Sequence, residues 1–258
     1  MGFKVATSNE FQQSSQKNRV TPRVVFLGMI FVTFLILSNL TAFKIAEFHL
    51  SHFAFIDRWF GNVDINFPAA LIFFPLTYFF DDTLTEVYGF AVSRLIIWSG
   101  LFCNSIFTLG ALLTVHLHPS PFWHDQSQFA LVLDAAPRIF IASLIGYFFG
   151  EFLNSMVISK IKIITKGKWL WFRIVSSTGL GVLIDSTLFC VIAFLGKIPN
   201  SIIINMIIVQ FVFKISYEII ALPFTYWLVG YLKKKDQIDF YDTKTSYNPF
   251  SLSLDQKA

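Results

Sequence analysis

Charged residues are scarce in this sequence, and long stretches lack them entirely. Only 14% of the 258 residues are Asp, Glu, Lys or Arg, and the mean hydropathy is +0.61, whereas a typical soluble domain has roughly 25% charged residues. Residues 24–43 and 95–115 contain no charged side chain. About 20 apolar residues are enough to cross the hydrocarbon of a bilayer. The composition therefore excludes a soluble globular protein and predicts one all-α, polytopic membrane domain.

Cysteine and the common catalytic motifs are also scarce or missing. Cys103 and Cys190 both lie in apolar stretches, which excludes a disulfide framework and a Cys-x-x-Cys metal site. Gly-x-Ser-x-Gly, His-Glu-x-x-His and a Gly-rich phosphate loop are absent. His116, His118 and His124 lack the helical spacing of a zinc site, so solvated histidines are the simpler interpretation. We expect no enzyme, no metal site and no cofactor.

Six apolar stretches predict six transmembrane helices. They cover approximately residues 24–46, 67 onward, 95–115, 139–159, 174–196 and 202–232. The uncharged part of the second stretch, Phe67 to Phe80, has 14 residues and would form only about 21 Å of helix. To cross a membrane it must include Asp81, Asp82 and Glu86. The membrane domain is predicted as residues 24–232, flanked by polar tails at 1–23 and 233–258.

The basic residues are unevenly distributed along the chain. Fifteen of the 20 Lys and Arg residues lie in the two tails, the 81–94 turn and the 160–173 loop. The positive-inside rule then predicts that both termini are cytoplasmic. Because these residues flank apolar stretches, the net charge of +4 is explained by membrane orientation, and no nucleic-acid partner is expected.

Ten charged residues lie in or at the ends of the predicted spans. Each costs ~2.5–3.5 kcal/mol at the centre of a membrane helix, so they must pair, face water or stay neutral. The excess of acids over bases favours a site for cations, hydrogen-bond donors or protons. The ten residues are Asp81, Asp82, Glu86, Glu151, Asp185, Glu218, Lys44, Arg94, Arg138 and Lys214.

Simpler explanations compete for some of these charges. Lys214 and Glu218 are four residues apart, so an intrahelical ion pair explains them as well as a functional role does. Arg138 follows Pro137 at the mouth of a span, where interfacial snorkelling is the simpler interpretation. Asp-x-Thr-Leu occurs at 81–84 and at 185–188, which would fit a 3+3 inverted repeat. A match of that length also arises by chance, so the repeat stays open.

Specific motifs identify a resemblance that composition cannot give. The most recognisable is Thr-Glu-Val-Tyr-Gly at 85–89, together with the segment from Lys214 to Glu218. With these the chain resembles the queuosine precursor transporter family, six-span bacterial proteins once grouped as putative vitamin uptake transporters. The resemblance covers almost everything from Ser38 to Phe250. Further matching residues are Ser38-Asn39, Pro75, Tyr78, Asp82, Arg94, Pro137-Arg138, Ala142-Ser143, Gly150-Glu151-Phe152, Asn154, Arg173, Ser176-Ser177-Thr178, Asp185-Ser186, Tyr217, Pro223, Tyr241-Asp242 and Asn248-Pro249-Phe250.

The resemblance implies uptake of 7-deazaguanine precursors of the tRNA base queuosine across the bacterial inner membrane. The cyano and aminomethyl forms, and queuine, are the implied substrates. Lys214 and Glu218 are expected to form a gating or coupling pair. Val182 follows Gly181 where family members often have Gln or Glu, so substrate preference can differ. The expected substrate-binding residues are Asn39, Asp82, Glu86, Arg138, Glu151, Asn154 and Asp185.

Two functional hypotheses remain at this point. The first is an importer of these small molecules that works by alternating access. The alternative is a substrate-capture subunit of an energised uptake complex for another planar, vitamin-like compound. In both, the partners are the lipid bilayer and the small-molecule substrate. The sequence leaves open the coupling ion, a homo-oligomer and an energising partner.

Overall fold

The described part of the chain is almost entirely helical. The computed structural model describes residues 20–41, 44–49, 64–133, 137–197, 199–251 and 254, and within them the predicted all-α class is confirmed except for one short hairpin. The elements are α2 (Pro22–Thr41), β1 (Ile45–His49), β2 (Asp64–Pro68), the 3-10 helix η2 (Ala69–Ile72), α4 (Phe74–Tyr88), α5 (Phe90–His116), α6 (Gln126–Leu133), α7 (Pro137–Ile164), α8 (Leu170–Phe194) and α9 (Asn200–Asp236).

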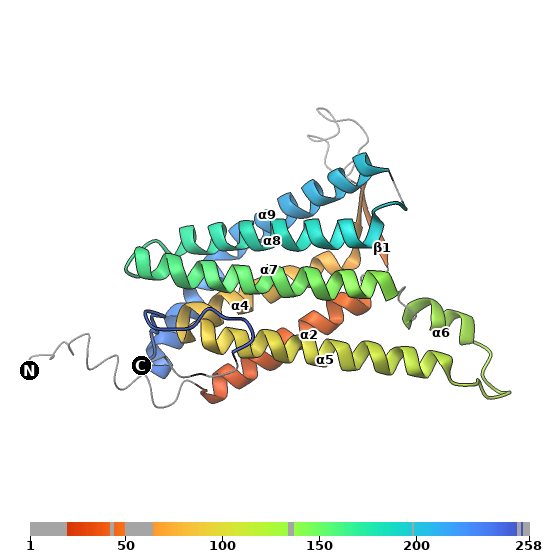
Figure 1. Cartoon of the computed structure of the whole chain (residues 1–258), viewed down its shortest axis with the longest axis horizontal. Coiled ribbons are helices and arrows are strands. Elements are labelled where there is room, and N and C mark those ends of the chain that lie inside the picture. Colours follow the sequence, from red (N-terminus) through yellow and green to blue (C-terminus); the bar gives the residue numbers. More distant parts are fainter. Residues whose placement is uncertain are drawn as a thin grey trace, which may run out of the picture.

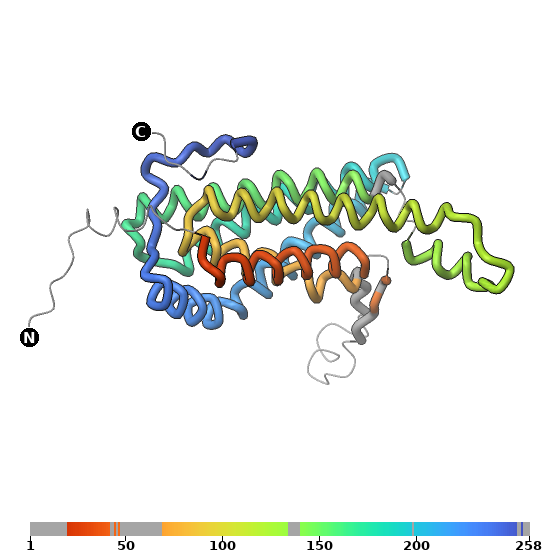
Figure 2. The backbone as a smooth tube through the Cα atoms, turned by 90° about the horizontal axis from the view of Figure 1, so that it is seen from below, coloured from red at the N-terminus to blue at the C-terminus, as the bar shows by residue number. Residues whose placement is uncertain are grey.

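The six larger helices of the described chain, α2, α4, α5, α7, α8 and α9, form a bundle in which consecutive helices run in opposite directions (Figures 1 and 2). At one end α2 begins, α4 meets α5, α7 turns into α8, and α9 ends. We call this the basic end, because it carries Arg94, Lys162, Arg173 and residues 233–235, which are all lysines. The antiparallel hairpin of β1 and β2 lies at the opposite end.

Burial in the bundle is reversed relative to a soluble protein. Large apolar side chains such as Phe102 (67% exposed) and Ile220 (73%) lie on the outside, whereas Asp82 and Glu151 are fully buried. Lipid-facing surfaces are expected to be apolar, while ionisable groups face the interior. Among the described residues, five helices are long and apolar enough to cross a membrane: α2, α5, α7, α8 and α9.

The second predicted span differs from the helix that forms there. It was expected to start near Phe67, but Asp64–Pro68 pairs with Ile45–His49, so α4 begins only at Phe74 and ends at Tyr88. The same pairing ends the first span at Thr41 rather than at residue 46. The 15 residues of α4 give about 22 Å of helix. This is shorter than the hydrocarbon core of a typical bilayer.

Gly89 separates α4 from α5 and allows the sharp change of direction between them. Its φ of +88° lies where a side chain is strained. The third span therefore begins at Phe90, not at Leu95 as predicted. Further along the chain, Gln126–Leu133 forms α6 within a segment that was expected to be a loop. Both differences lengthen the helical part of the chain.

Glycines allow α7 and α8 to approach each other closely. A Cβ atom added at Gly181 would lie 2.9 Å from the carbonyl oxygen of Gly150, and one at Gly150 would lie 3.1 Å from that of Gly181. Small residues at such crossings are typical of membrane helices. The contact brings Glu151 on α7 close to the α8 residues that line the interior, so it positions the polar groups described below.

Gly181→Val should destabilise the protein, because its side chain would overlap the backbone of α7. Overpacking of this kind costs about 1–3 kcal/mol. Gly230→Val is a matched control, since a Cβ at Gly230 meets nothing within 4 Å. We expect a lower midpoint of thermal unfolding in detergent for Gly181→Val than for Gly230→Val. Equal midpoints would show that the close crossing does not contribute to stability.

Candidate functional site

Two neighbouring aspartates of α4 lie at the centre of a buried polar cluster. Asn154 on α7 donates one hydrogen bond to Asp82 Oδ1 at 2.5 Å and one to Asp81 Oδ2 at 3.3 Å. Ser155 donates to Asp81 Oδ2 at 2.6 Å, and Ser93 donates to Asp81 Oδ1. Thr178 of α8 donates to Asp82 Oδ2 at 3.3 Å. All four oxygens of this pair therefore accept hydrogen bonds from neutral groups.

Next to this cluster lie three buried polar atoms whose hydrogen-bonding capacity is not used by the part of the chain that the structure describes. Glu151 Oε1 accepts from Thr77 at 3.3 Å. In contrast, Glu151 Oε2, Asn154 Oδ1 and Tyr78 Oη have no hydrogen-bond partner among the described residues. Glu151 and Asn154 lie three apart on one face of α7, and the Tyr78 hydroxyl packs against Gly150. A buried polar atom without a partner costs about 1–3 kcal/mol, so this position suits a ligand that donates hydrogen bonds.

An ion pair connects α8 to α9 in the interior. Lys214 Nζ lies 2.6 Å from Asp185 Oδ2, 3.4 Å from Ser186 Oγ and 4.2 Å from the centroid of the Phe74 ring. The intrahelical alternative paired Lys214 with Glu218, but in the structure the lysine reaches across to α8. Glu218 Oε1 is buried and has no hydrogen-bond partner in the described part of the chain.

Asn39 lies in a separate chain of amides and hydroxyls that joins α2, α5 and α7. Asn39 Nδ2 donates to Asn104 Oδ1 at 3.3 Å, and Ser143 Oγ donates to Asn39 Oδ1 at 2.8 Å. The side chain of Arg138 lies outside what the structure describes. Val182 is fully buried, so a polar residue at this position would also face the interior.

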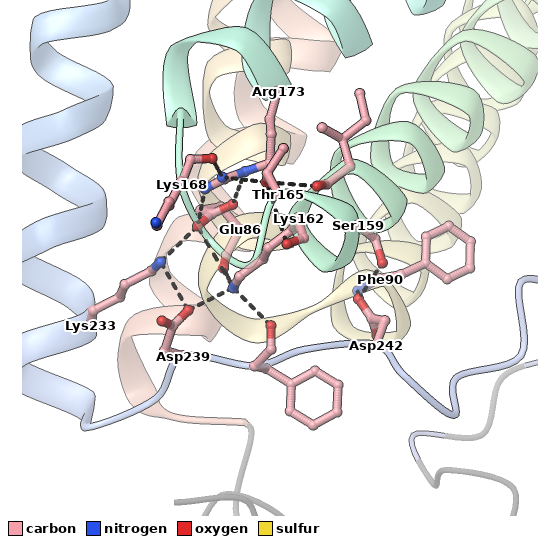
Figure 3. A network of polar contacts seen from close by, with 12 residues as sticks. Glu86, Phe90, Ser159, Lys162, Thr165, Lys168, Arg173, Lys233, Asp239 and Asp242 are labelled. Atoms are coloured by element: carbon pink, nitrogen blue, oxygen red, sulfur yellow. Dashed lines mark hydrogen bonds and ion pairs between the residues drawn. The ribbon is translucent and has the colours of Figure 1, made fainter. Parts of the chain in front are cut away.

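Glu86 is one helical turn from Asp82, towards the basic end, and is surrounded by cations (Figure 3). Arg173 donates to both of its carboxylate oxygens, through Nη2 to Oε1 at 2.8 Å and through Nε to Oε2 at 3.1 Å. Lys233 Nζ lies 2.7 Å from Oε1, and Lys162 Nζ lies 3.7 Å from it. Two-pronged arginine contacts of this kind are among the strongest charged hydrogen bonds.

Asp239, which follows α9, is the second acid of this network. Its Oδ1 lies 2.7 Å from Lys162 Nζ and 2.9 Å from Lys233 Nζ. Partial burial raises the pKa of the Asp239 carboxyl, but the charges of Lys162 and Lys233 outweigh this and hold the pKa below its usual value. Asp239 is therefore ionised at neutral pH, and its contribution to stability is lost only as the pH falls through that lowered pKa.

The structure brings some of the predicted site residues together and separates others. Asp82 and Asn154 are in direct contact, and Glu151 lies beside them. Asp185 pairs with Lys214, Asn39 belongs to another network, and Glu86 belongs to the basic end. Their roles in substrate binding stay predictions. Helical spacing does not reveal partners on other helices, so sequence reasoning assigned no role to several polar residues of these networks. They are the buried residues Ser93, Asn104, Ser155 and Lys162, and the partly exposed Asp239.

The Asp185–Lys214 pair predicts non-additive effects of mutation. Asp185→Asn alone leaves a buried ammonium without its carboxylate, and breaking a buried pair costs about 3–5 kcal/mol. Lys214→Met alone should be similarly destabilising. The double variant removes both charges and should recover most of the loss, as measured by thermal unfolding in detergent. If the two effects simply add, Lys214 does not depend on Asp185.

Comparison with known proteins gives an independent result. The profile of the putative vitamin uptake transporter family matches residues 68–228. A probable queuosine precursor transporter of Bacillus subtilis strain 168 is 30% identical over 158 residues, which cover 60% of this chain and 68% of that protein. No solved structure gives a significant match. The family match covers more than half of the chain and includes α4, α7 and α8, which contribute to the buried polar cluster around Asp81 and Asp82. This chain is therefore a member of the putative vitamin uptake transporter family, a membrane transporter rather than an enzyme.

Proposed function

We propose that this protein imports 7-deazaguanine precursors of queuosine, in the cyano or aminomethyl form or as queuine, across the bacterial inner membrane. The Bacillus subtilis relative, a probable queuosine precursor transporter, supports this substrate class. Three buried atoms that have no hydrogen-bond partner among the described residues carry the proposal: Glu151 Oε2, Asn154 Oδ1 and Tyr78 Oη. They provide acceptors, together with one hydroxyl that can donate, where a ligand would need them.

The chemistry of the base fits these atoms. A deazaguanine presents a ring N–H beside an exocyclic amine, and a carboxylate can accept from both donors at once. Glu151 is the suitable carboxylate, because one of its oxygens has no partner among the described residues, whereas both oxygens of Asp82 already accept hydrogen bonds. The Tyr78 hydroxyl is a candidate donor to the carbonyl of the base.

The remaining predicted site residues support recognition in different ways. Asp82 orients Asn154 through their hydrogen bond. Asp185 pairs with Lys214, and its negative charge would favour the cationic aminomethyl form once that lysine moves away. Asn39 and Arg138 are proposed to contact the substrate on its path from the hairpin end, and Glu86 on its path to the basic end.

The proposed transport domain is residues 24–232, with α4 as the sixth crossing. The alternating helix directions support this arrangement, and the buried acids of α4 can avoid lipid because other helices surround them. The lysines and arginines at the basic end favour a cytoplasmic location for that end and for both termini. A 3+3 inverted repeat would relate Asp81 on α4 to Asp185 on α8, both of which are buried.

We propose that Lys214 and Glu218 couple binding to movement. Lys214 pairs with Asp185 in this structure, while Glu218 Oε1 lies one turn along α9 without a partner in the described chain. A shift of Lys214 from Asp185 to Glu218 would release the aspartate for a proton or a cationic substrate. The two states of alternating access would then differ in the partner of Lys214, which is Asp185 in one and Glu218 in the other.

The direct test is queuosine in tRNA, in a bacterial strain that lacks both precursor synthesis and its own importer. Expression of this chain should restore queuosine when the precursor is supplied at nanomolar concentration. Glu151→Gln should reduce the rate of uptake roughly tenfold or more, because a hydrogen bond to a charged group contributes about 1.5–3 kcal/mol. Asp125→Asn, an exposed site on the α5–α6 connection, should leave uptake unchanged.

Normal uptake by Glu151→Gln at equal membrane abundance would refute the site assignment. Failure of the unmodified chain to restore queuosine would refute the substrate class. Reconstitution in liposomes separates the importer from the alternative: a purified importer transports alone, whereas a capture subunit binds substrate but does not move it.

A further inference from the structure

The segment after α9, residues 237–251, lies across the basic end of the bundle (Figure 2). We call it the C-terminal strap. The Phe240 amide donates to Val87 O at 3.0 Å. Asp242 Oδ2 accepts from the Phe90 amide at 2.9 Å and from Ser159 Oγ at 2.7 Å. The strap therefore covers the junction between α4 and α5 and the last turns of α7.

Further contacts hold the distal part of the strap. Arg94 Nη1 donates to the carbonyl oxygens of Ser246 at 2.9 Å and Asn248 at 3.0 Å. Trp98 Nε1 donates to Pro249 O at 2.7 Å. In each of these bonds the acceptor is a backbone carbonyl oxygen of the strap. If the strap lifts, water molecules can accept the hydrogen bonds of Arg94 and Trp98 instead. The contacts are thus specific but compatible with release.

The strap also balances charge at the basic end. Three cations, Lys162, Arg173 and Lys233, converge there from three different helices. Glu86 and Asp239 provide the two negative charges, and Asp239 belongs to the strap (Figure 3). If the strap leaves, three cations share one carboxylate. Their repulsion would then favour separation of α7, α8 and α9 at this end.

We propose that the C-terminal strap is a latch that closes the basic end and must release before that end opens. Asp239 is its charged contact, and Asp242 and the Trp98–Pro249 bond fix its position. While it is docked, the strap and the Glu86 network separate the buried polar cluster around Asp81 and Asp82 from the solvent at this end. Release of Asp239 weakens the network and opens a path alongside α8. The proposal requires transport by this family but not a particular substrate.

Cysteine accessibility tests the latch without any substrate. In a background with Cys103→Ala and Cys190→Ala, Ser177→Cys places a thiol on α8 one turn inward from Arg173, at a fully buried position. Lys234→Cys, at an exposed position, marks the membrane face on which the basic end lies. A membrane-impermeant maleimide is then applied to each face in turn, using inside-out and right-side-out vesicles.

Labelling of residue 177 should be slow when the strap is intact. Asp239→Asn should increase the rate roughly tenfold from the basic face only, since it removes a charged hydrogen bond. Trp98→Phe loses the hydrogen bond to Pro249 and should also increase the labelling rate of residue 177. This variant provides a second test if Asp239→Asn does not reach the membrane. Asp125→Asn is the matched control and should have no effect.

Unchanged labelling in Asp239→Asn and Trp98→Phe would overturn the proposal, even if both variants unfold at lower temperature. An equal increase of the labelling rate from both membrane faces would also overturn the proposal, because it would indicate a general loosening of the helix bundle. As no ligand is present, failure here leaves the proposed substrate untouched, and failure to restore queuosine leaves the latch untouched.

Discussion

The need to find partners for buried carboxylates governs this structure. A short helix, α4, places Asp81, Asp82 and Glu86 on or near one face inside an apolar bundle. Unpaired charges are costly in such surroundings, so the neighbouring helices must supply donors. Helices α7 and α8 can do so because glycines allow them to pack closely. The packing of the bundle and its internal chemistry therefore depend on each other.

The partners change in kind along α4. Around Glu86, near the basic end, they are cations that form a closed network with the C-terminal strap. One turn further in, the described donors to Asp81 and Asp82 are neutral amides and hydroxyls, and one oxygen of Glu151 has no hydrogen-bond partner among the described residues. A network of ion pairs is suited to holding one end of the bundle closed, whereas hydrogen-bond acceptors without a described partner are suited to binding a ligand. On this difference in partners rest the proposals of a binding region at Glu151 and a latch at the basic end.

The sequence predicts the features that depend on local composition. Apolar stretches predicted the five helices of the described chain that are long and apolar enough to cross a membrane, while the second predicted span corresponds to the shorter α4. The acids of 81–86 indicated an internal polar cluster. The boundaries of α4 could not be predicted, because the strand Asp64–Pro68 depends on pairing with Ile45–His49. The partner of Lys214 was also inaccessible, since spacing along one helix favours Glu218 and only packing brings Asp185 within reach. The strap shows no periodicity, and it is held by contacts with residues as many as 154 positions away in the sequence.

The central claim, that Glu151 accepts the donor edge of a deazaguanine, is tested most directly by equilibrium binding to the purified protein. Two ligands should be compared: the cyano-deazaguanine and the same base without its exocyclic amine. The account predicts that the amine-bearing base binds roughly tenfold more tightly or better, because its loss leaves a buried acceptor unpaired. Glu151→Gln should abolish this preference. Equal affinity of the unmodified protein for both bases, or an undiminished preference in Glu151→Gln, would contradict it.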